Sequence, residues 1–292
     1  MPIATLTTAV DVQVSLDGSE FCYAKFINQG YVETIRNDEI NCGHVDPELE
    51  GDAAGREINR FIILLDITVP MLEKLLPKLG TTGATGVYSS DTTLSSFTTL
   101  VNFGATTHKW TETYITRAIF RGGVSTVPIS LEIHCVGVQE EDEASPTFTP
   151  ATMEYIYGFP GTGFTVAGTS YDIPNFAFVI DRNLVFDWNS SRYITGVGRG
   201  KRNTLLATST PYLAAKKSVY WGNKTYLLGR DVKLLLTNGT KTVEFQLPLA
   251  KLNAKGPSID DVAIPIRLPL TWEARRQVSP ASPAFKITIT TL

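Results

Sequence analysis

The sequence is poor in the features that mark membrane-spanning and secreted proteins. Its 292 residues include only three cysteines, and its longest apolar run, residues 61–65, has the length of a strand. About 18 consecutive apolar residues would be needed to span a bilayer. The first residues have no basic region followed by an apolar core, so no signal peptide is expected. We therefore expect no membrane contact and synthesis in the cytoplasm, with reduced thiols at Cys22, Cys42 and Cys135.

The chain also has little net charge. Lys and Arg total 26 and Asp and Glu total 29, which leaves a formal charge of −3. Such a balance provides no global attraction to nucleic acid or to an anionic membrane. A weakly acidic protein can nevertheless surround DNA without binding it, because it makes few favourable phosphate contacts.

Motifs for catalysis, nucleotide binding and metal binding are missing. Gly196 and Gly200 are separated by three residues rather than the four of a phosphate-binding loop, and Arg202 stands where that loop needs Ser or Thr. The few histidines and cysteines do not have the spacing of a zinc site, and no nucleophile elbow occurs. We therefore expect no catalytic residue, no bound cofactor and no metal ligand, and we predict that the protein is not an enzyme.

Alternation of apolar and polar residues dominates what is present. Residues 114–120, 129–133, 233–236 and 286–290 alternate as half-buried strands do, and Asn238-Gly239 is typical of a hairpin turn. The pattern predicts a mainly β fold.

Helix signals are few. Residues 70–80 form the best candidate, with Thr68 as a possible N-cap and Gly80 as a possible end. Pro77 should end this helix early or kink it. Residues 212–220 are a second candidate.

The two halves of the chain share an ordered pair of motifs. Residues 63–72 (ILLDITVPML) match 204–213 (TLLATSTPYL) at an offset of 141 (211 − 70), and residues 127–133 match 264–270 at an offset of 137 (265 − 128). Chance similarity between β-rich segments is the alternative explanation. Two matches in the same order favour an internal duplication.

A boundary between the duplicated units is expected near the acidic run at residues 140–143. Four consecutive acids followed by Pro146 predict a solvated, irregular connector. The predicted domains are residues 1–148 and 149–292, each with one or two short helices.

Several short segments resemble the tail tube proteins of long-tailed bacteriophages. The resemblance covers most of the chain beyond about the first thirty residues and is carried by strand pattern and small loop motifs at residues 175–184, 193–196, 200–204, 242–248, 257–261 and 264–268. It implies two tandem tail-tube-type β-sandwich/barrel folds, each with a short flanking helix. In this family six such folds form a ring whose inner sheets join, and the rings stack into a hollow tube.

The resemblance implies a structural virion protein of the phage tail, made in the host cytoplasm, that self-assembles into a conduit for DNA ejection. The partner of the chain would be itself, in a trimeric ring of six folds or, if the repeat is chance, a hexameric ring. Further implied partners are a tape-measure protein, a tail terminator and distal tail proteins, while DNA passes through the lumen without specific binding. Alternatives are an injection tube of a secretion system or contractile particle, a tail adaptor, a head decoration protein and a carbohydrate-binding β-sandwich.

Two segments of opposite charge are candidates for contacts between stacked rings. The first lies within residues 37–56 and the second within residues 189–203, which hold comparable positions in the two halves. Solvated loops without a binding role are the alternative, since exposed ion pairs contribute under about 1 kcal/mol each. The candidate contact residues are Asp46, Glu48, Glu50, Asp52, Arg199, Lys201 and Arg202.

Overall fold

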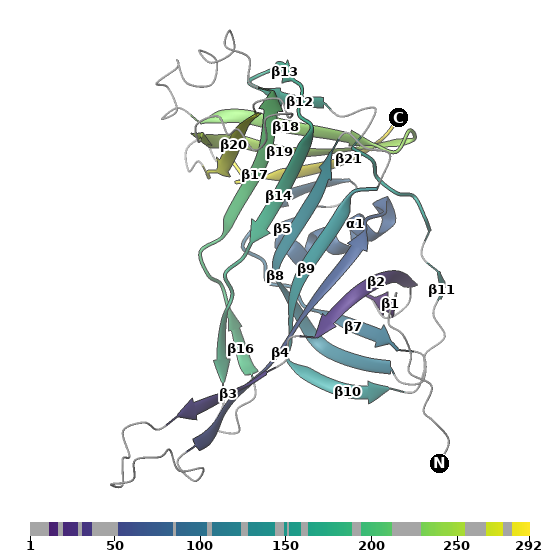
Figure 1. The fold of residues 1–292 in the computed structure, drawn as a ribbon, viewed down its shortest axis with the longest axis vertical. Helices are drawn as coiled ribbons and strands as arrows, with labels where there is room; N and C mark the ends of the chain where they lie inside the picture. The colour runs from purple at the N-terminus through teal and green to yellow at the C-terminus, as the bar shows by residue number, and fades with distance from the viewer. Residues whose placement is uncertain are drawn as a thin grey trace.

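The protein is built mainly of antiparallel strands, which confirms the fold class predicted from the sequence (Figure 1). The structure, a computed structural model, describes residues 12–16, 20–28, 31–36, 52–83, 86–103, 107–123, 128–143, 149–150, 152–158, 163–188, 194–211, 229–254, 267–276 and 282–292.

Strands of the first half form a closed barrel. The pairings run from β1 to β2, β4, β9, β8 and β7 and return to β1. Shorter strands β5 and β6 follow the helix, β3 pairs with the start of β4, and β10 pairs with the start of β8. The bounds are β1 Val12–Ser15, β2 Glu20–Asn28, β3 Tyr31–Arg36, β4 Asp52–Asp66, β5 Thr81–Thr82, β6 Val87–Ser90, β7 Phe97–Asn102, β8 Thr107–Gly123, β9 Ser130–Gly137 and β10 Gln139–Glu143.

Aromatic side chains fill the barrel. The rings of Phe61 and Trp110 lie 4.8 Å apart, and Phe26 contacts both at 5.4 Å. Gly137 lies against this cluster, and a Cβ there would come within 2.6 Å of the Trp110 ring. The absence of a side chain at Gly137 therefore lets the indole pack directly on the barrel wall.

The predicted helix lies directly after β4. It consists of α1 (Val69–Leu75) followed by the 3₁₀ turn η2 (Leu76–Leu79). The Thr68 side chain accepts a hydrogen bond from the backbone N–H of Met71, and Gly80 ends the segment with a left-handed φ of 71°. Both end signals are therefore confirmed, and the change from α to 3₁₀ geometry occurs next to Pro77, as proline in a helix requires.

The second half is joined to the barrel through β8. Strand β14 pairs with β8 over seven residues, and β17, β20, β19 and β18 follow in the sheet. Strand β21 pairs with both β19 and β6, and β11 pairs with β2. The bounds are β11 Thr149–Pro150, β12 Gly163–Val166, β13 Thr169–Tyr171, β14 Asn175–Asp181, β15 Val185–Trp188, β16 Ile194–Gly198, β17 Asn203–Pro211, β18 Arg230–Thr237, β19 Lys241–Ala254, β20 Arg267–Ala274 and β21 Lys286–Thr291.

One order of strand pairing occurs twice. In the first half β2 pairs with β4, β4 with β9, β9 with β8, and β8 with β7. In the second half β14 pairs with β17, β17 with β20, β20 with β19, and β19 with β18. Each half also projects a hairpin, formed by β3 with β4 and by β15 with β16, toward the lower left of Figure 1.

The registers of these pairs agree at one offset. Leu65 lies opposite Leu131, and Leu206 lies opposite Trp272, so both partners are 141 residues apart (206 − 65 and 272 − 131). The offset of 137 expected for the second pair of motifs therefore differs from the strand register by four residues.

Two ion pairs repeat at the same spacing. Glu132 contacts His134 at 2.6 Å, and Glu273 contacts Arg275 at 2.7 Å. The members of the second pair again lie 141 residues after those of the first (273 − 132 and 275 − 134).

The segment expected to be an irregular connector is a strand. Residues 139–143 form β10 and pair with residues 107–111 of β8, so the irregular structure predicted for the acidic run is wrong. Within the described part of the chain β10 pairs only with β8, so it is an edge strand. Charged residues are common on edge strands because they discourage pairing with another chain.

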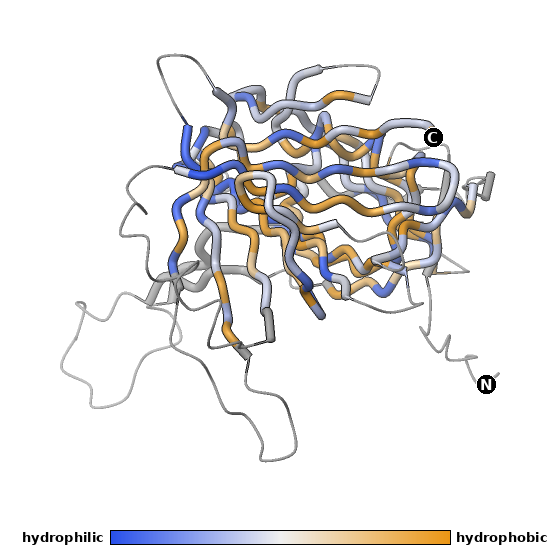
Figure 2. The backbone as a smooth tube through the Cα atoms, turned by 90° about the horizontal axis from the view of Figure 1, so that it is seen from above, coloured by the Kyte–Doolittle hydropathy of each residue, from blue (hydrophilic) through white to orange (hydrophobic). Residues whose placement is uncertain are grey.

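Both halves share one core. Figure 2 shows apolar and polar positions alternating along individual strands, as expected when one face of each strand is buried. The buried faces meet in one cluster that includes Phe120 of β8, Phe178 of β14 and Phe245 of β19. The Phe178 ring lies 4.9 Å from Phe245 and 6.0 Å from Phe285.

Phe178→Ala should lower the free energy of unfolding by about 3–5 kcal/mol, because it opens a cavity where the two halves meet. Chemical denaturation measures the change. Val185→Ala is the control, because Val185 is 61% exposed and should change stability by less than about 0.5 kcal/mol. Equal stability of the two variants would contradict a shared core.

Candidate functional site

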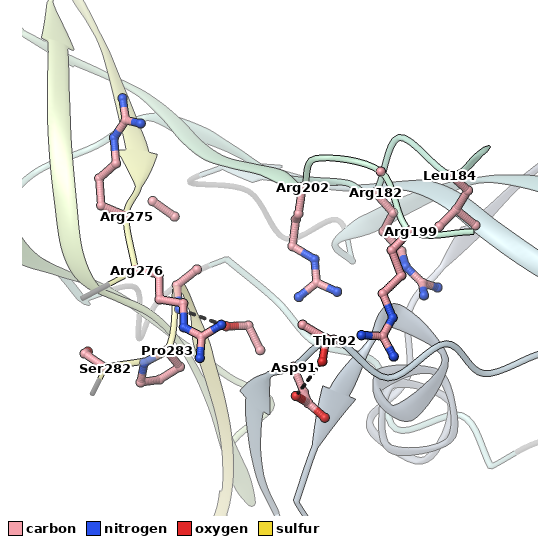
Figure 3. Close-up of a pocket in the computed structure, with 14 residues that line it drawn as sticks. Asp91, Thr92, Arg182, Leu184, Arg199, Arg202, Arg275, Arg276, Ser282 and Pro283 are labelled. Carbon is pink, nitrogen blue, oxygen red and sulfur yellow. Dashed lines mark hydrogen bonds between the residues drawn. The ribbon is translucent and has the colours of Figure 1, made fainter. Parts of the chain in front are cut away.

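Five arginines surround a pocket between the two halves of the chain. They come from the ends of β14 and β20 and from the segment that joins β16 to β17. Figure 3 shows Arg182, Arg199 and Arg202 on one side and Arg275 and Arg276 on the other. The cavity has a volume of about 620 Å³ and is lined by Ser90, Asp91, Thr92, Arg182, Leu184, Arg199, Gly200, Arg202, Ala274, Arg275, Arg276, Ser282, Pro283 and Ala284.

Arg182 is the most deeply buried of the five, with 4% of its surface exposed. Its guanidinium donates to the backbone carbonyls of Lys78 at 2.7 Å, of Thr93 at 3.4 Å and of Ile115 at 3.4 Å. These bonds connect the first residue after β14 to the end of η2 and to β8. Burial lowers the pKa of Arg182 to about 10, and the positive charge of Arg202 lowers it further.

Arg202 contacts the same helix end. One guanidinium nitrogen lies 3.5 Å from the carbonyl oxygen of Leu79, and the guanidinium carbon lies 5.7 Å from the centre of the Phe285 ring. Burial lowers the pKa of Arg202, while the Asp91 carboxylate acts in the opposite direction. A Cβ at Gly80 would come within 2.4 Å of the Arg202 guanidinium, so the glycine also makes room for this side chain.

Asp91 is the only carboxylate among the residues that line the pocket. The hydroxyl groups of Thr92 and Thr93 donate to it, and these bonds, that of Thr93 first, lower its pKa. Asp91 is therefore ionised at neutral pH and offsets one of the five positive charges.

The structure brings only part of the predicted charged set together. Arg199 and Arg202 line the pocket, whereas Lys201 is exposed beside it and does not. Because the Arg202 guanidinium packs inside the molecule, its side chain has a structural role in addition to its charge.

The acidic candidates cannot be compared with them. Asp46, Glu48 and Glu50 lie outside the described residues. Asp52 begins β4, where its backbone pairs with Arg36 of β3.

Sequence reasoning missed Arg182, Arg275 and Arg276. Arg182 directly follows a strand, and Arg275 and Arg276 follow another strand more than ninety positions later in the chain. No local motif marks any of them, since only the pairing of distant strands brings them to one pocket. The single usable signal was Arg199 and Arg202 close together in a segment without acids.

The remaining titratable groups do not form a recognisable reactive site in the part of the chain that is described. No group of three or more His, Cys, Asp or Glu side chains there is arranged to hold a metal ion. Burial raises the pKa of the Cys22 thiol to about 12 and raises that of Cys135 even more, so neither is a ready nucleophile. None of the described helices is long and apolar enough to cross a membrane.

Comparison with known proteins adds no assignment. No protein-family model matches the chain, and no curated protein has significant sequence similarity to it.

Arg182→Leu should lower the free energy of unfolding by about 2 kcal/mol, because it leaves buried carbonyls without their donor. Urea denaturation measures the change. Arg199→Leu in the same pocket is the matched control and should have little effect, because Arg199 is exposed. If the two variants are equally stable, the contacts of Arg182 with η2 and β8 do not stabilise the fold.

Proposed function

We propose that this chain is a tail tube subunit of a bacteriophage, which assembles with copies of itself into stacked rings around a channel for DNA. The observation that supports this proposal most strongly is the pairing of β14 with β8. It joins two sets of strands that share one pairing order and one register offset. Two such units already associate edge to edge within one chain, so the same contact can continue between chains.

The repeat identifies the strands that would meet between chains. Strand β19 holds the place of β8 in the second half, and β2 holds the place of β14 in the first half. A head-to-tail contact would therefore join β19 of one copy to β2 of the next. Head-to-tail contacts of this kind close into rings when the rotation between units permits.

The register of this contact follows from the pairs that are present. Val179 lies opposite Ile119 where β14 meets β8. Lys25 pairs with Leu64 as Val179 pairs with Leu205, 141 residues later. Lys251 pairs with Glu273 as Ile119 pairs with Glu132. The repeat thus places Lys25 of one copy opposite Lys251 of the next.

The edges needed for this contact are partly open. Among the described strands, residues 25–28 of β2 pair only with β4, and residues 251–254 of β19 pair only with β20. Strand β1 pairs with residues 22–24 of β2, so a longer junction requires β1 to leave that edge. Unpaired edges promote association with another chain.

Exposed apolar side chains lie on the same strand. Tyr23 is 54% exposed and Ile27 is 38% exposed, and both project from β2. Large apolar side chains at a surface are often covered in an assembly. Their place beside the open edge supports a contact through β2.

Channel and stacking fit the charge of the chain. A net charge of −3 avoids strong phosphate binding, which would slow the passage of DNA. Arg199 and Lys201 are exposed and remain candidates for contacts between rings. In a tail, the tube would also contact a tape-measure protein, a tail terminator and distal tail proteins.

Electron microscopy of the purified protein tests the proposal. We expect rings or hollow tubes, and we expect them to become more abundant as salt rises, because salt screens the repulsion between Lys25 and Lys251. A protein that stays monomeric at all salt and protein concentrations would contradict a tube subunit.

A cysteine pair tests the register directly. In a Cys42→Ser background, the variant with both Lys25→Cys and Lys251→Cys should form a series of covalent multimers on oxidation, because directly opposite Cβ atoms lie about 4.5–5.5 Å apart. Non-reducing gel electrophoresis reports the products. Each single variant is a control and should give dimers at most. If the double variant gives no more than the single variants, β19 and β2 do not meet in this register.

A further inference from the structure

The arginine pocket carries more positive charge than its surroundings offset. Five guanidinium groups line it with one carboxylate, that of Asp91. Glu273 lies 2.7 Å from Arg275 and neutralises that side chain. No other carboxylate among the described residues lies within ion-pair distance of Arg182, Arg199, Arg202 or Arg276.

Two of these charges are held away from solvent at a free-energy cost. Arg182 is nearly fully buried and Arg202 is half-buried. Both donate to backbone carbonyls at the end of η2, which are neutral partners. A buried charge is costly unless an opposite charge compensates it. Burial lowers the pKa of both groups, in keeping with this shortage of negative charge.

The same contacts fix the pocket in a form suited to an anion. The carbonyls of Lys78 and Thr93 hold the Arg182 guanidinium, and the Phe285 ring lies beside that of Arg202. Each guanidinium has five N–H donors, and the bonds described for these two side chains use only some of them. Across the cavity, Arg276 is exposed and free to close on a ligand.

We propose that this pocket binds an oxyanion of the phosphate or carboxylate type. Planar guanidinium groups bind such oxygens through paired, charge-assisted hydrogen bonds. The cavity of about 620 Å³ exceeds the size of one phosphate ion. Its apolar residues Leu184, Ala274 and Pro283 leave room for an organic body attached to the anion. The anion joins the end of η2 to both halves of the chain and stabilises the junction between them.

Two sources can supply this oxyanion, namely a free phosphate compound and an acidic side chain of a second copy of the chain. The first test uses dilute protein that light scattering shows to be monomeric. Its melting temperature is measured against inorganic phosphate, with sodium chloride at equal ionic strength as the reference. A free-ligand site predicts a saturable rise in melting temperature with phosphate and none with chloride.

Paired variants distinguish the pocket from a general salt effect. Arg199→Gln combined with Arg276→Gln removes two exposed pocket charges and should raise the half-saturating phosphate concentration at least about tenfold, because each charge-assisted bond contributes strongly. Lys201→Gln makes the same charge change beside the pocket and should leave the phosphate response unchanged.

The second test uses protein at a concentration where it assembles. If a second copy supplies the oxyanion, phosphate should disperse the assemblies of the unmodified protein by occupying the pocket. The Arg199→Gln and Arg276→Gln variant should then assemble poorly without phosphate. The proposal is overturned if phosphate neither stabilises the monomer nor disperses assemblies, or if its effect is the same in the double variant. The monomer test does not depend on assembly, so it holds whether or not the chain is a tube subunit.

Discussion

Strand β8 is the element on which the rest of the structure depends. Its 17 residues pair with β7 and β10 near the start of the strand and with β9 and β14 toward the end. A shift in register between Ile115 and Arg117 lets this one strand serve the closed barrel and the sheet of the second half. Such irregularities bend a strand and increase its twist. Without this change of direction, the second half would have no edge on which to pair.

The cost of this arrangement is concentrated where the halves meet beside the helix. The last turn of η2 ends with carbonyls that have no partner within the helix, a general property of helix ends. Arg182 and Arg202 provide donors for two of them, from a segment more than a hundred positions away. Aromatic packing around Phe178 and Phe245 buries the apolar side of the same junction. The junction is therefore stabilised by packing and hydrogen bonding, at the expense of excess positive charge.

Local features were predictable from the sequence, and long-range features were not. Thr68, Pro77 and Gly80 act within one or two turns of chain, so their effects on α1 and η2 could be derived directly. Asn238-Gly239 likewise gives the hairpin of β18 and β19, where the Asn238 side chain accepts from the backbone of Lys241.

The acidic run at residues 140–143 misled the analysis because charge indicates solvent, and an edge strand is also solvated. The pairing of β14 with β8 and the position of Arg182 depend on which distant strands meet, and single-sequence patterns carry no information on that choice. The offset of 141 was visible in one pair of motifs, but only the strand registers extended it to the second pair.

The central claim is that one chain holds two like units and joins its neighbours as those units are joined to each other. The rotational symmetry of the assembled ring tests this most directly, through averaged electron cryomicroscopy images of ring or tube cross-sections. We predict three chains per ring, with threefold symmetry and approximate sixfold symmetry from the two units of each chain. Six chains in a ring with true sixfold symmetry, or a contact between chains that does not involve β19 and β2, would contradict the account.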